Sequence, residues 1–406
     1  MDFQPSEKSQ AYLAKLKAFM AEHVLPQEQA IVAENRRLNE HVDWREWQVP
    51  SAIDELKAKA KATGLWNLFL PDAELAEGLS CLEYAPLAEE TGKVLFAPEI
   101  FNCNAPDTGN MEVLYHFGNE QQKQQWLSPL LNGDIRSVFA MTEPDVASSD
   151  ATNMQARIDV DGDELVLNGT KWWTTGLGHP KAKVAIFMGL SNPENDKHNQ
   201  HSMVLVPLDT PGVNIKRMLT ASQDYDAPYG HGEVEFSNVR VPKTNLLVGL
   251  GKGFAIAQGR LGPGRIHHCM RAIGAAERCL ELMIKRGMSR VAFGKPIIKL
   301  GGNMERIAQA RMAIDQARLL TLNAAWKIDN VGVKQAMTEI SAIKVVVPNM
   351  LQMVSDMAIQ MHGGAGVSGD FPVSMFSAMA RMLRLADGPD EVHMAMVSRL
   401  ELKKYS

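Results

Sequence analysis

The spacing of apolar residues changes twice along this chain of 406 residues, and the order of the changes limits the folds open to it. Residues 1–138 show helical spacing, as in the stretch from Tyr12 to Val24. Residues 139–247 carry short apolar runs of strand length, and residues 248–406 return to helical spacing. This order predicts an α+β chain with an N-terminal α-helical domain, a central antiparallel β domain and a C-terminal helical bundle. It argues against the βαβ alternation of a nicotinamide-dependent dehydrogenase.

Short runs rich in Val, Ile and Leu carry the strand signal in the middle of the chain. Turn-forming pairs such as Asp161-Gly162 and Asn168-Gly169 separate them, at intervals typical of antiparallel strands. The predicted strands are Gln155–Val160, Glu164–Leu167, Val184–Leu190, His201–Pro207, Gly212–Met218 and Gly232–Val241.

Helical spacing is strongest in the last third of the chain. Ile340, Ile343, Val347 and Met350 alternate steps of three and four residues, which is typical of a helix packed inside a bundle. Of the 23 methionines, 15 lie from Met270 onward. Because methionine is unbranched and adapts to irregular cores, we interpret this bias as bundle core rather than as a ligand-binding surface.

Charge and cysteine content exclude several classes of protein. The chain has 42 Lys+Arg against 47 Asp+Glu, a formal net charge of −5, so no nucleic-acid partner is expected. The four cysteines form no CxxC pair and stand at no metal-ligand spacing from histidine, so neither disulfides nor a metal site are expected. No apolar run reaches the roughly 18 residues of a membrane-spanning helix, and the first residues do not resemble a secretion signal. We therefore expect a cytoplasmic protein with no membrane span.

The run from Gly249 to Gly253 is similar to a dinucleotide-binding loop, but the third glycine of the motif would fall at Phe254. A flexible loop before a helix that starts near Phe254 is the preferred interpretation.

The segment from Phe139 to Asp150 gathers hydroxyls and backbone donors, which can bind phosphate or a flat heteroaromatic ring and which also occur in ordinary turns. Adjacent strand residues point to opposite faces, so at most one of Trp172 and Trp173 is expected in the interior.

Five segments resemble signature motifs of the acyl-CoA dehydrogenase family, in the family's order and over essentially the whole chain. They are Thr142-Glu-Pro, Trp172-Trp-Thr, Arg290-Val-Ala-Phe-Gly, Gln360-Met-His-Gly-Gly and Arg384-Leu-Ala-Asp-Gly. The resemblance implies the acyl-CoA dehydrogenase fold, with a C-terminal four-helix bundle and FAD held between the β domain, the bundle and a neighbouring subunit. Asp387, where most members have glutamate, and the long turn at Asp145–Ser149 are similar to the branch of family members 10 and 11.

The resemblance assigns four groups of residues to FAD and the substrate. The residues expected along the flavin ring are Phe139, Met141, Thr142, Trp172 and Thr174. Ser148 and Ser149 are expected at the FAD pyrophosphate and at the pantetheine of the substrate; which serine does which stays open, because the turn is one residue longer than usual. The residues expected to contact FAD in a partner subunit are Arg290, Phe293, Gln360, Gly363 and Gly364. Pro389 and Glu391 replace a threonine and a glutamine that family members place at the polar edge of the flavin.

Asp387 aligns with the catalytic glutamate of the family and is the candidate base. An α-proton beside a thioester is a weak acid, so the site must polarise the thioester oxygen and exclude water. The alternative role for Asp387 is that of a helix N-cap, and Asp390 and Glu391 are the rival carboxylates. A second position that family members use for the base is Gly264 here, which cannot serve.

Two further residues are expected near the substrate, and three histidines invite a different interpretation. Arg265 corresponds to an arginine near the CoA entrance, and Gly388 to a backbone that approaches the substrate. Histidines 267, 268 and 362 resemble general-base candidates, but no partner spacing supports that role, and we interpret them as packing or edge residues.

The function implied is that of an FAD-dependent acyl-CoA dehydrogenase. It would convert an acyl-CoA to a trans-2-enoyl-CoA, pass the hydride to flavin N5 and the electrons to an electron-transfer flavoprotein, and form a homodimer or homotetramer. Three alternatives stay open: a nitroalkane oxidase, an acyl-CoA oxidase and a DNA-binding flavoprotein of the same fold. The acyl chain length is not fixed, although residues 91–109 are expected to form the pocket floor.

Overall fold

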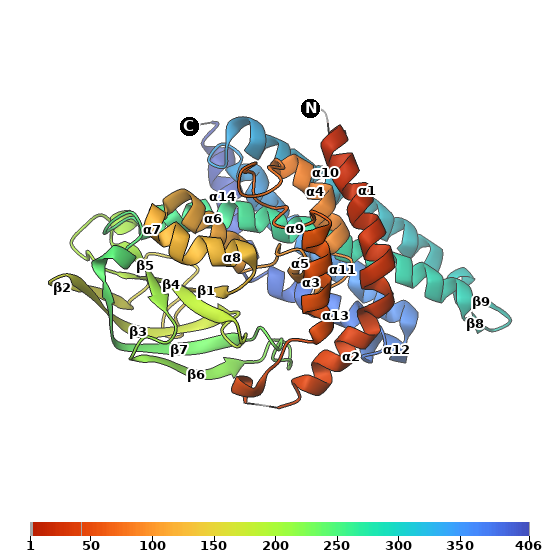
Figure 1. Cartoon of the computed structure of the whole chain (residues 1–406). Helices are drawn as coiled ribbons and strands as arrows, with labels where there is room; N and C mark the ends of the chain where they lie inside the picture. The colour runs from red at the N-terminus through yellow and green to blue at the C-terminus, as the bar shows by residue number, and fades with distance from the viewer. Residues whose placement is uncertain (1–2, 42, 406) are drawn as a thin grey trace. The chain divides into compact units, whose positions relative to one another are not determined.

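The computed structural model describes residues 3–41 and 43–405, apart from the side chains of residues 261–263. The chain forms two compact units. The bundle unit consists of Met1–Pro26, Pro71–Pro98 and Gly262–Ser406, and the sheet unit of Gln27–Leu70 and Glu99–Leu261. Each unit therefore combines segments that lie far apart in the sequence (Figure 1).

A seven-stranded sheet is the centre of the sheet unit (Figure 1). Its strands are β1 (Arg136–Ala140), β2 (Arg157–Asp161), β3 (Glu164–Thr175), β4 (Ala182–Leu190), β5 (His201–Pro207), β6 (Val213–Leu219) and β7 (His231–Pro242). The strands run in the order β1-β4-β2-β3-β7-β6, with β5 paired to β4. All six predicted strands are present, and β3 extends eight residues past its predicted end at Leu167, through the two tryptophans.

The antiparallel prediction is wrong at β4, which has two parallel pairings. The strand β1 was not expected and pairs with β4 in parallel, and β2 pairs with β4 in parallel at Arg157 and Leu190. Strands β1 and β4 are almost entirely buried, so neither shows the alternation of a half-exposed strand. The sequence of β1 also begins with Arg136 and Ser137, which hid it from a search for apolar runs. Both side chains are buried; Asp107 accepts hydrogen bonds from the backbone N–H and the hydroxyl of Ser137 and forms an ion pair with Arg136.

Short helices complete the sheet unit, and they are α2 (Glu28–Leu38), α3 (Ser51–Ala62), α6 (Asp107–Phe117), α7 (Glu120–Gln122) and α8 (Ser128–Asn132). The short helix α5 (Ala97–Ile100) lies where the two units meet in sequence. Helix α6 ends at Phe117, although helical spacing of apolar residues continues beyond it. Asn119 and Gln122 form a capping box there that starts a new helix.

Helices form most of the bundle unit, and α9, α10 and α11 are the longest of them (Figure 1). They are α1 (Glu7–Phe19), α4 (Cys81–Thr91), α9 (Gly253–Ser289), α10 (Asn303–Val331), α11 (Met337–His362), α12 (Gly364–Val367), α13 (Val373–Leu383) and α14 (Asp390–Leu402). Helix α9 starts at Gly253, which confirms the loop interpretation of the preceding glycines, and its residues up to Leu261 count with the sheet unit. A hairpin of β8 (Val291–Ala292) and β9 (Lys295–Pro296) extends from the end of α9.

Helix α11 is the core helix of the bundle and contacts α10, α13 and α14. Its predicted seam, from Ile340 to Met350, is buried. Among the described residues it is the one helix whose length and composition would suit a membrane span, and half of its most apolar window is buried inside the protein. Helices at the centre of soluble bundles have this character as well.

Helices α4 and α9 cross at two glycines. A Cβ atom at Gly274 would lie 1.8 Å from the carbonyl oxygen of Glu89, and one at Gly92 would lie 2.1 Å from that of Arg271. No other residue type allows two helix backbones to approach so closely. The crossing therefore fixes how α9 lies in the bundle.

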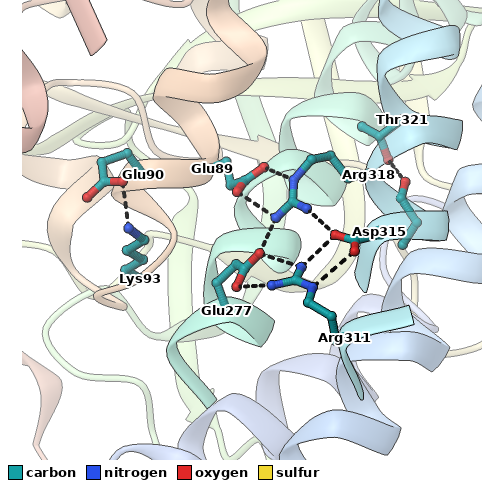
Figure 2. A network of polar contacts seen from close by, with 9 residues as sticks. Glu89, Glu90, Lys93, Glu277, Arg311, Asp315, Arg318 and Thr321 are labelled. Carbon is teal, nitrogen blue, oxygen red and sulfur yellow. Dashed lines mark hydrogen bonds and ion pairs between the residues drawn. The ribbon is translucent and has the colours of Figure 1, made fainter. Parts of the chain in front are cut away.

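Five charged residues on α4, α9 and α10 form a network beside this crossing (Figure 2). Arg318 binds both carboxylate oxygens of Glu89, each at 2.9 Å, and Arg311 binds those of Glu277 at 3.0 and 2.7 Å. Asp315 accepts hydrogen bonds from both arginines, and Arg318 also contacts Glu277. Planar guanidinium groups suit such two-pronged contacts.

The network makes the stability of the bundle depend on pH through Glu277. Burial opposes ionisation of Glu277, but the hydrogen bonds from Arg311 and Arg318 outweigh it and lower the pKa. A carboxylate with a lowered pKa stabilises the folded state above its unfolded pKa, about 4.3, and that contribution is lost as the pH falls through its folded pKa. We expect Glu277→Gln to lower the free energy of unfolding by about 1–2 kcal/mol at neutral pH, measured by denaturant titration.

The matched control is Glu235→Gln, which breaks an exposed ion pair with Lys216 on the sheet. It should cost less than about 0.5 kcal/mol, because solvent screens exposed pairs. The difference between the two variants should disappear at a pH below the folded pKa of Glu277. A deficit for Glu277→Gln that stays constant at low pH would contradict the account.

Candidate active site

In the sheet unit, a buried ion pair joins the two motifs expected along the flavin ring. Lys171 is completely buried, and its Nζ lies 2.7 Å from Oε1 of Glu143 and donates to the carbonyl of Met141 at 2.8 Å. The carboxylate of Glu143 also accepts from the backbone N–H groups of Gln155 and Ala156. Burial lowers the pKa of Lys171 to about 8, against the attraction of Glu143. Glu143 and Lys171 thus hold the segment after β1 against β3.

The backbone continues this link at Trp172, whose N–H donates to the carbonyl of Thr142 at 3.0 Å. Regular alternation along β3 ends here, because the pairing with β7 shifts between Lys171 and Thr174, and Trp173 has a φ of 50°. Trp172 is half-buried and Trp173 is 41% exposed, so neither tryptophan lies fully in the interior. The sequence predicted at most one interior tryptophan but did not predict the bulge.

Thr174 provides a test of whether these residues suit a flavin. Its side chain is completely buried, and its hydroxyl has no hydrogen-bond partner among the residues that the structure describes. A buried hydroxyl without a partner costs free energy, so it indicates a missing polar ligand. Thr174 is followed by the end of β3, and Met141 and Thr142 in the neighbouring segment are half-buried. The set therefore fits a flat polar ring such as a flavin.

The two serines of the long turn differ in their surroundings. The Ser148 hydroxyl accepts from the N–H of Glu143 at 2.9 Å and lies 3.4 Å from the carbonyl of the same residue. Ser149 is exposed. Ser148 therefore stabilises its own turn, and Ser149 has the more accessible hydroxyl of the two.

Phe139 lies in β1 next to an arginine that the sequence analysis did not single out. The guanidinium of Arg260, on α9, lies 4.0 Å from the centre of the Phe139 ring, and its Nε donates to Asn110 at 3.1 Å. Glu112 is buried beside this group, and burial raises its pKa to about 8, against the charge of Arg260. A polar cluster therefore backs the residue expected at the flavin.

In the bundle unit, Asp387 lies in a tight turn between α13 and α14. Asp387 has a φ of 54° and Gly388 a φ of 102°. Aspartate tolerates this left-handed conformation better than most residues, and a Cβ at Gly388 would lie 2.9 Å from Nε2 of His393. The carbonyl of Asp387 accepts from Nε of Arg265 at 3.1 Å and lies 3.2 Å from Nε2 of His393. These contacts hold the turn by its backbone.

Two residues of α9 face the carboxylate of Asp387. A Cβ at Gly264 would lie 4.0 Å from Oδ2 of Asp387, an ordinary van der Waals distance. Gly264, the second position that family members use for the base, and Asp387, which aligns with the catalytic glutamate, therefore face each other. Nε2 of His268 lies 3.5 Å from the same oxygen, although the sequence analysis placed this histidine among packing or edge residues. The side chain of Asp387 is 20% exposed.

The rival roles for this segment find less support. Helix α14 is capped by Pro389 without a side-chain bond, so Asp387 is not the N-cap. Asp390 is buried and accepts hydrogen bonds from Arg384 at 2.8 Å and from Asn349 at 3.2 Å. Its carboxylate therefore links α14 to α11 and to the end of α13. Glu391 is exposed in the first turn of α14.

Arg265 and the other histidines have mainly structural surroundings. Arg265 is 8% exposed, and burial lowers its pKa against the attraction of Asp387. His267 is buried edge-on against Tyr84, and burial lowers its pKa to about 3. His362 is buried, with Nδ1 2.7 Å from the carbonyl of Ala358. The described residues contain no cluster of three or more metal-ligating side chains.

The residues expected to reach a partner subunit are exposed. Phe293 is 94% exposed at the tip of the β8–β9 hairpin, and it and Gly294 both have positive φ. Arg290, which precedes the hairpin, is exposed as well. At the end of α11, Gln360, Gly363 and Gly364 are exposed, and a Cβ at either glycine would meet open space.

A mostly apolar hollow of about 510 Å³ in the bundle unit is a different feature. Its wall includes Leu13, Met270, Ile273 and the network residue Arg318, and it contains neither Asp387 nor His268. The hollow is therefore not the site of the base.

Comparison with known proteins agrees with the motifs. Family models of the N-terminal, middle and C-terminal domains of acyl-CoA dehydrogenases match residues 6–134, 138–239 and 251–401. Acyl-CoA dehydrogenase family member 11 of Rattus norvegicus is 52% identical over 99% of this chain, which spans about half (51%) of that relative's length. The probable acyl-CoA dehydrogenase FadE2 of Mycobacterium tuberculosis is 54% identical, over 100% of this chain and 98% of the relative.

Solved structures share the fold. A putative acyl-CoA dehydrogenase from Mycobacterium abscessus has a TM-score of 0.96 and 58% identity, over 99% of this chain and all of the other. A glutaryl-CoA dehydrogenase from Mycobacterium smegmatis in complex with FADH2 has a TM-score of 0.80 and 22% identity, over 97% and 94% of the two chains. The fold expectation is confirmed, as is the branch resemblance to member 11.

Proposed function

Because this chain belongs to the acyl-CoA dehydrogenase family of oxidoreductases, we propose that it is an FAD-dependent acyl-CoA dehydrogenase with Asp387 as its base. The observation that carries the proposal is the convergence of Asp387 and Gly264. A Cβ at Gly264 would lie 4.0 Å from Oδ2 of Asp387, so the two alternative positions for the family's base face each other, and only Asp387 holds a carboxylate.

In the proposed reaction, Asp387 removes the α-proton of the acyl thioester. The electron pair of that C–H bond forms the new double bond, and the β-hydrogen leaves with its own pair, giving a trans-2-enoyl-CoA. FAD, when bound, accepts that hydride at N5. The backbone contacts from Arg265 and His393 hold the turn, so that the carboxylate is positioned before the substrate arrives.

The sheet unit would hold the flavin ring. Phe139, Met141, Thr142, Trp172 and Thr174 would line it, and the unpartnered hydroxyl of Thr174 supports this assignment. Ser149 has the more accessible hydroxyl of the turn for the substrate, and Ser148 would act by shaping the turn near the pyrophosphate. Gly388 would face the thioester, and Pro389 and Glu391 the polar edge of the flavin.

A second copy of the chain would complete the cofactor site. Arg290 and Phe293 on one hairpin, with Gln360, Gly363 and Gly364 at the end of α11, would contact FAD of a neighbour in a homodimer or homotetramer. The support is the exposure of these residues, since an aromatic ring 94% exposed is costly in water. An electron-transfer flavoprotein would be the partner that takes up the electrons of the reaction.

We therefore expect Phe293→Asp to reduce both the oligomeric mass and the bound FAD, because a charge at the hairpin tip opposes burial in a neighbour. Light scattering and the ratio of flavin to protein absorbance measure the two effects. Val160→Asp, on an exposed apolar residue of the sheet, is the control and should leave both unchanged. A Phe293→Asp protein of unchanged mass that retains its FAD would refute the cross-subunit role.

The function itself is tested by mixing the yellow protein anaerobically with acyl-CoAs of about 4 to 22 carbons. We expect the flavin absorbance to bleach with some of them, and the electrons to pass to an electron-transfer flavoprotein with little peroxide formed in air. Bleaching with nitroalkanes alone would indicate a nitroalkane oxidase, and stoichiometric peroxide would indicate an acyl-CoA oxidase. The chain-length profile of the bleaching rate would identify the substrate class.

A further inference from the structure

His268 lies between the carboxylate of Asp387 and the guanidinium of Arg271. Its Nε2 is 3.5 Å from Oδ2 of Asp387, and its Nδ1 is 3.2 Å from Nη2 of Arg271. His268 and Arg271 are one turn apart on α9, so their side chains are neighbours on the surface of this helix. The side chain of His268 is 23% exposed, so it belongs to the wall of the site rather than to the bundle core.

Arg271 fixes which nitrogen of His268 carries the proton. A guanidinium group has only donors, so Nδ1 of His268 must be the acceptor in their contact. The proton of the neutral imidazole is therefore on Nε2, the nitrogen that faces Asp387. In this state the imidazole presents an N–H to the carboxylate and has no lone pair directed at it.

We propose that His268 is a positioning residue that orients Asp387 and keeps it ionised, an inference that rests on the function proposed above. Aspartate is one methylene shorter than the glutamate of most family members, so its carboxylate has less reach and depends more on a fixed orientation. An N–H beside one carboxylate oxygen favours the charged form of that carboxylate. His268 does not replace Asp387 as proton acceptor, because its Nδ1 is engaged by Arg271.

Other charged or titratable groups also act on Asp387, among them the buried thiol of Cys269 on α9. Arg265, on α9, binds the backbone carbonyl of Asp387. Lys344, buried on α11, and His393, on α14, both interact electrostatically with its carboxylate. A pH effect confined to His268 variants is therefore attributable to the contact with the imidazole.

The test compares His268→Phe with His268→Gln in the FAD-loaded protein. The amide of glutamine can donate to Asp387 and accept from Arg271, whereas phenylalanine can do neither. The rate of flavin reduction should fall at low pH, where Asp387 becomes protonated. In His268→Phe we expect the midpoint of this fall, the acid limb of the pH profile, to lie about one pH unit higher than in the wild type. Below that midpoint reduction should be about tenfold slower, with little change in KM. His268→Gln should keep the limb near that of the wild type.

Two more variants separate this role from general damage to α9. His267→Phe changes the neighbouring histidine, which faces Tyr84, and should not move the limb. Arg271→Met keeps the imidazole of His268 but no longer fixes its proton on Nε2. It should shift the acid limb of the pH profile to higher pH, by less than His268→Phe does. Arg271→Met also provides the answer if His268→Phe does not fold.

An unchanged limb in both His268→Phe and Arg271→Met would overturn the inference. So would a shift in His268→Gln as large as in His268→Phe, because the imidazole itself would then transfer the proton. Failure of the proposed function looks different, because either the wild type would not bleach with any acyl-CoA or Asp387→Asn would bleach normally.

Discussion

Asp387→Asn is expected to slow reduction of the flavin by an acyl-CoA by at least about 1000-fold, because it removes the base and leaves the rest of the site intact. Asparagine adopts the left-handed conformation of Asp387 as readily as aspartate, so the turn should keep its backbone contacts with Arg265 and His393. Stopped-flow measurement of flavin bleaching gives the rate, and the flavin absorbance of the resting protein shows that FAD is still bound.

The control for this substitution is Asp209→Asn. Asp209 is an exposed carboxylate in the sheet unit, and its loss should leave bleaching, FAD content and stability unchanged. Bleaching of Asp387→Asn at the rate of the Asp209→Asn protein would remove Asp387 from the mechanism and return attention to Glu391.

Lys171→Met is expected to have the largest effect on the resting protein. It removes the cation from a completely buried ion pair, so the charge of Glu143 is left in the interior next to two backbone donors. Removing one partner of a buried pair typically costs about 3–5 kcal/mol of stability. Because Lys171 also binds the carbonyl of Met141, we expect most of the FAD to be lost as well. Denaturant titration and the flavin content per chain measure the two effects.

The double variant Lys171→Met with Glu143→Gln distinguishes a buried charge from lost packing. It removes both charges, so part of the lost stability should return. No recovery would mean that the ion pair does not account for the defect. Full FAD content in Lys171→Met would show that the segment holding Met141 and Thr142 does not depend on this link.

Features with a local cause could be predicted from the sequence. Strands β2 to β7 have apolar runs bounded by turn pairs such as Asp161-Gly162, and the helical seam of α11 repeats every three to four residues. The strand β1 could not be found in this way, because its first residues, Arg136 and Ser137, are polar and are stabilised by Asp107 from another segment. The break after Phe117 did have a local signal, the capping box of Asn119 and Gln122.

The candidate site likewise contains residues that could be predicted from local motifs and contacts that could not. Family motifs led to Asp387, Thr174 and Phe293, each within its own short segment. The contacts of Asp387 with His268 and of Phe139 with Arg260 join positions far apart in the chain. Neither the spacing of histidines nor the pattern of charges in the sequence predicts such contacts. His393 likewise leaves no room for a side chain at Gly388, where the backbone is left-handed.

The role of Asp387 as the base can be tested by moving the carboxylate from position 387 to position 264. Gly264 lies on α9, and a Cβ there would be 4.0 Å from the carboxylate of Asp387. Glutamate is longer than aspartate by one methylene and favours a helix more than glycine does. The account predicts that Asp387→Asn alone does not bleach with acyl-CoA and that Gly264→Glu combined with Asp387→Asn regains measurable bleaching. If Asp387→Asn alone bleaches as fast as the wild type, Asp387 is not the base and the account is contradicted.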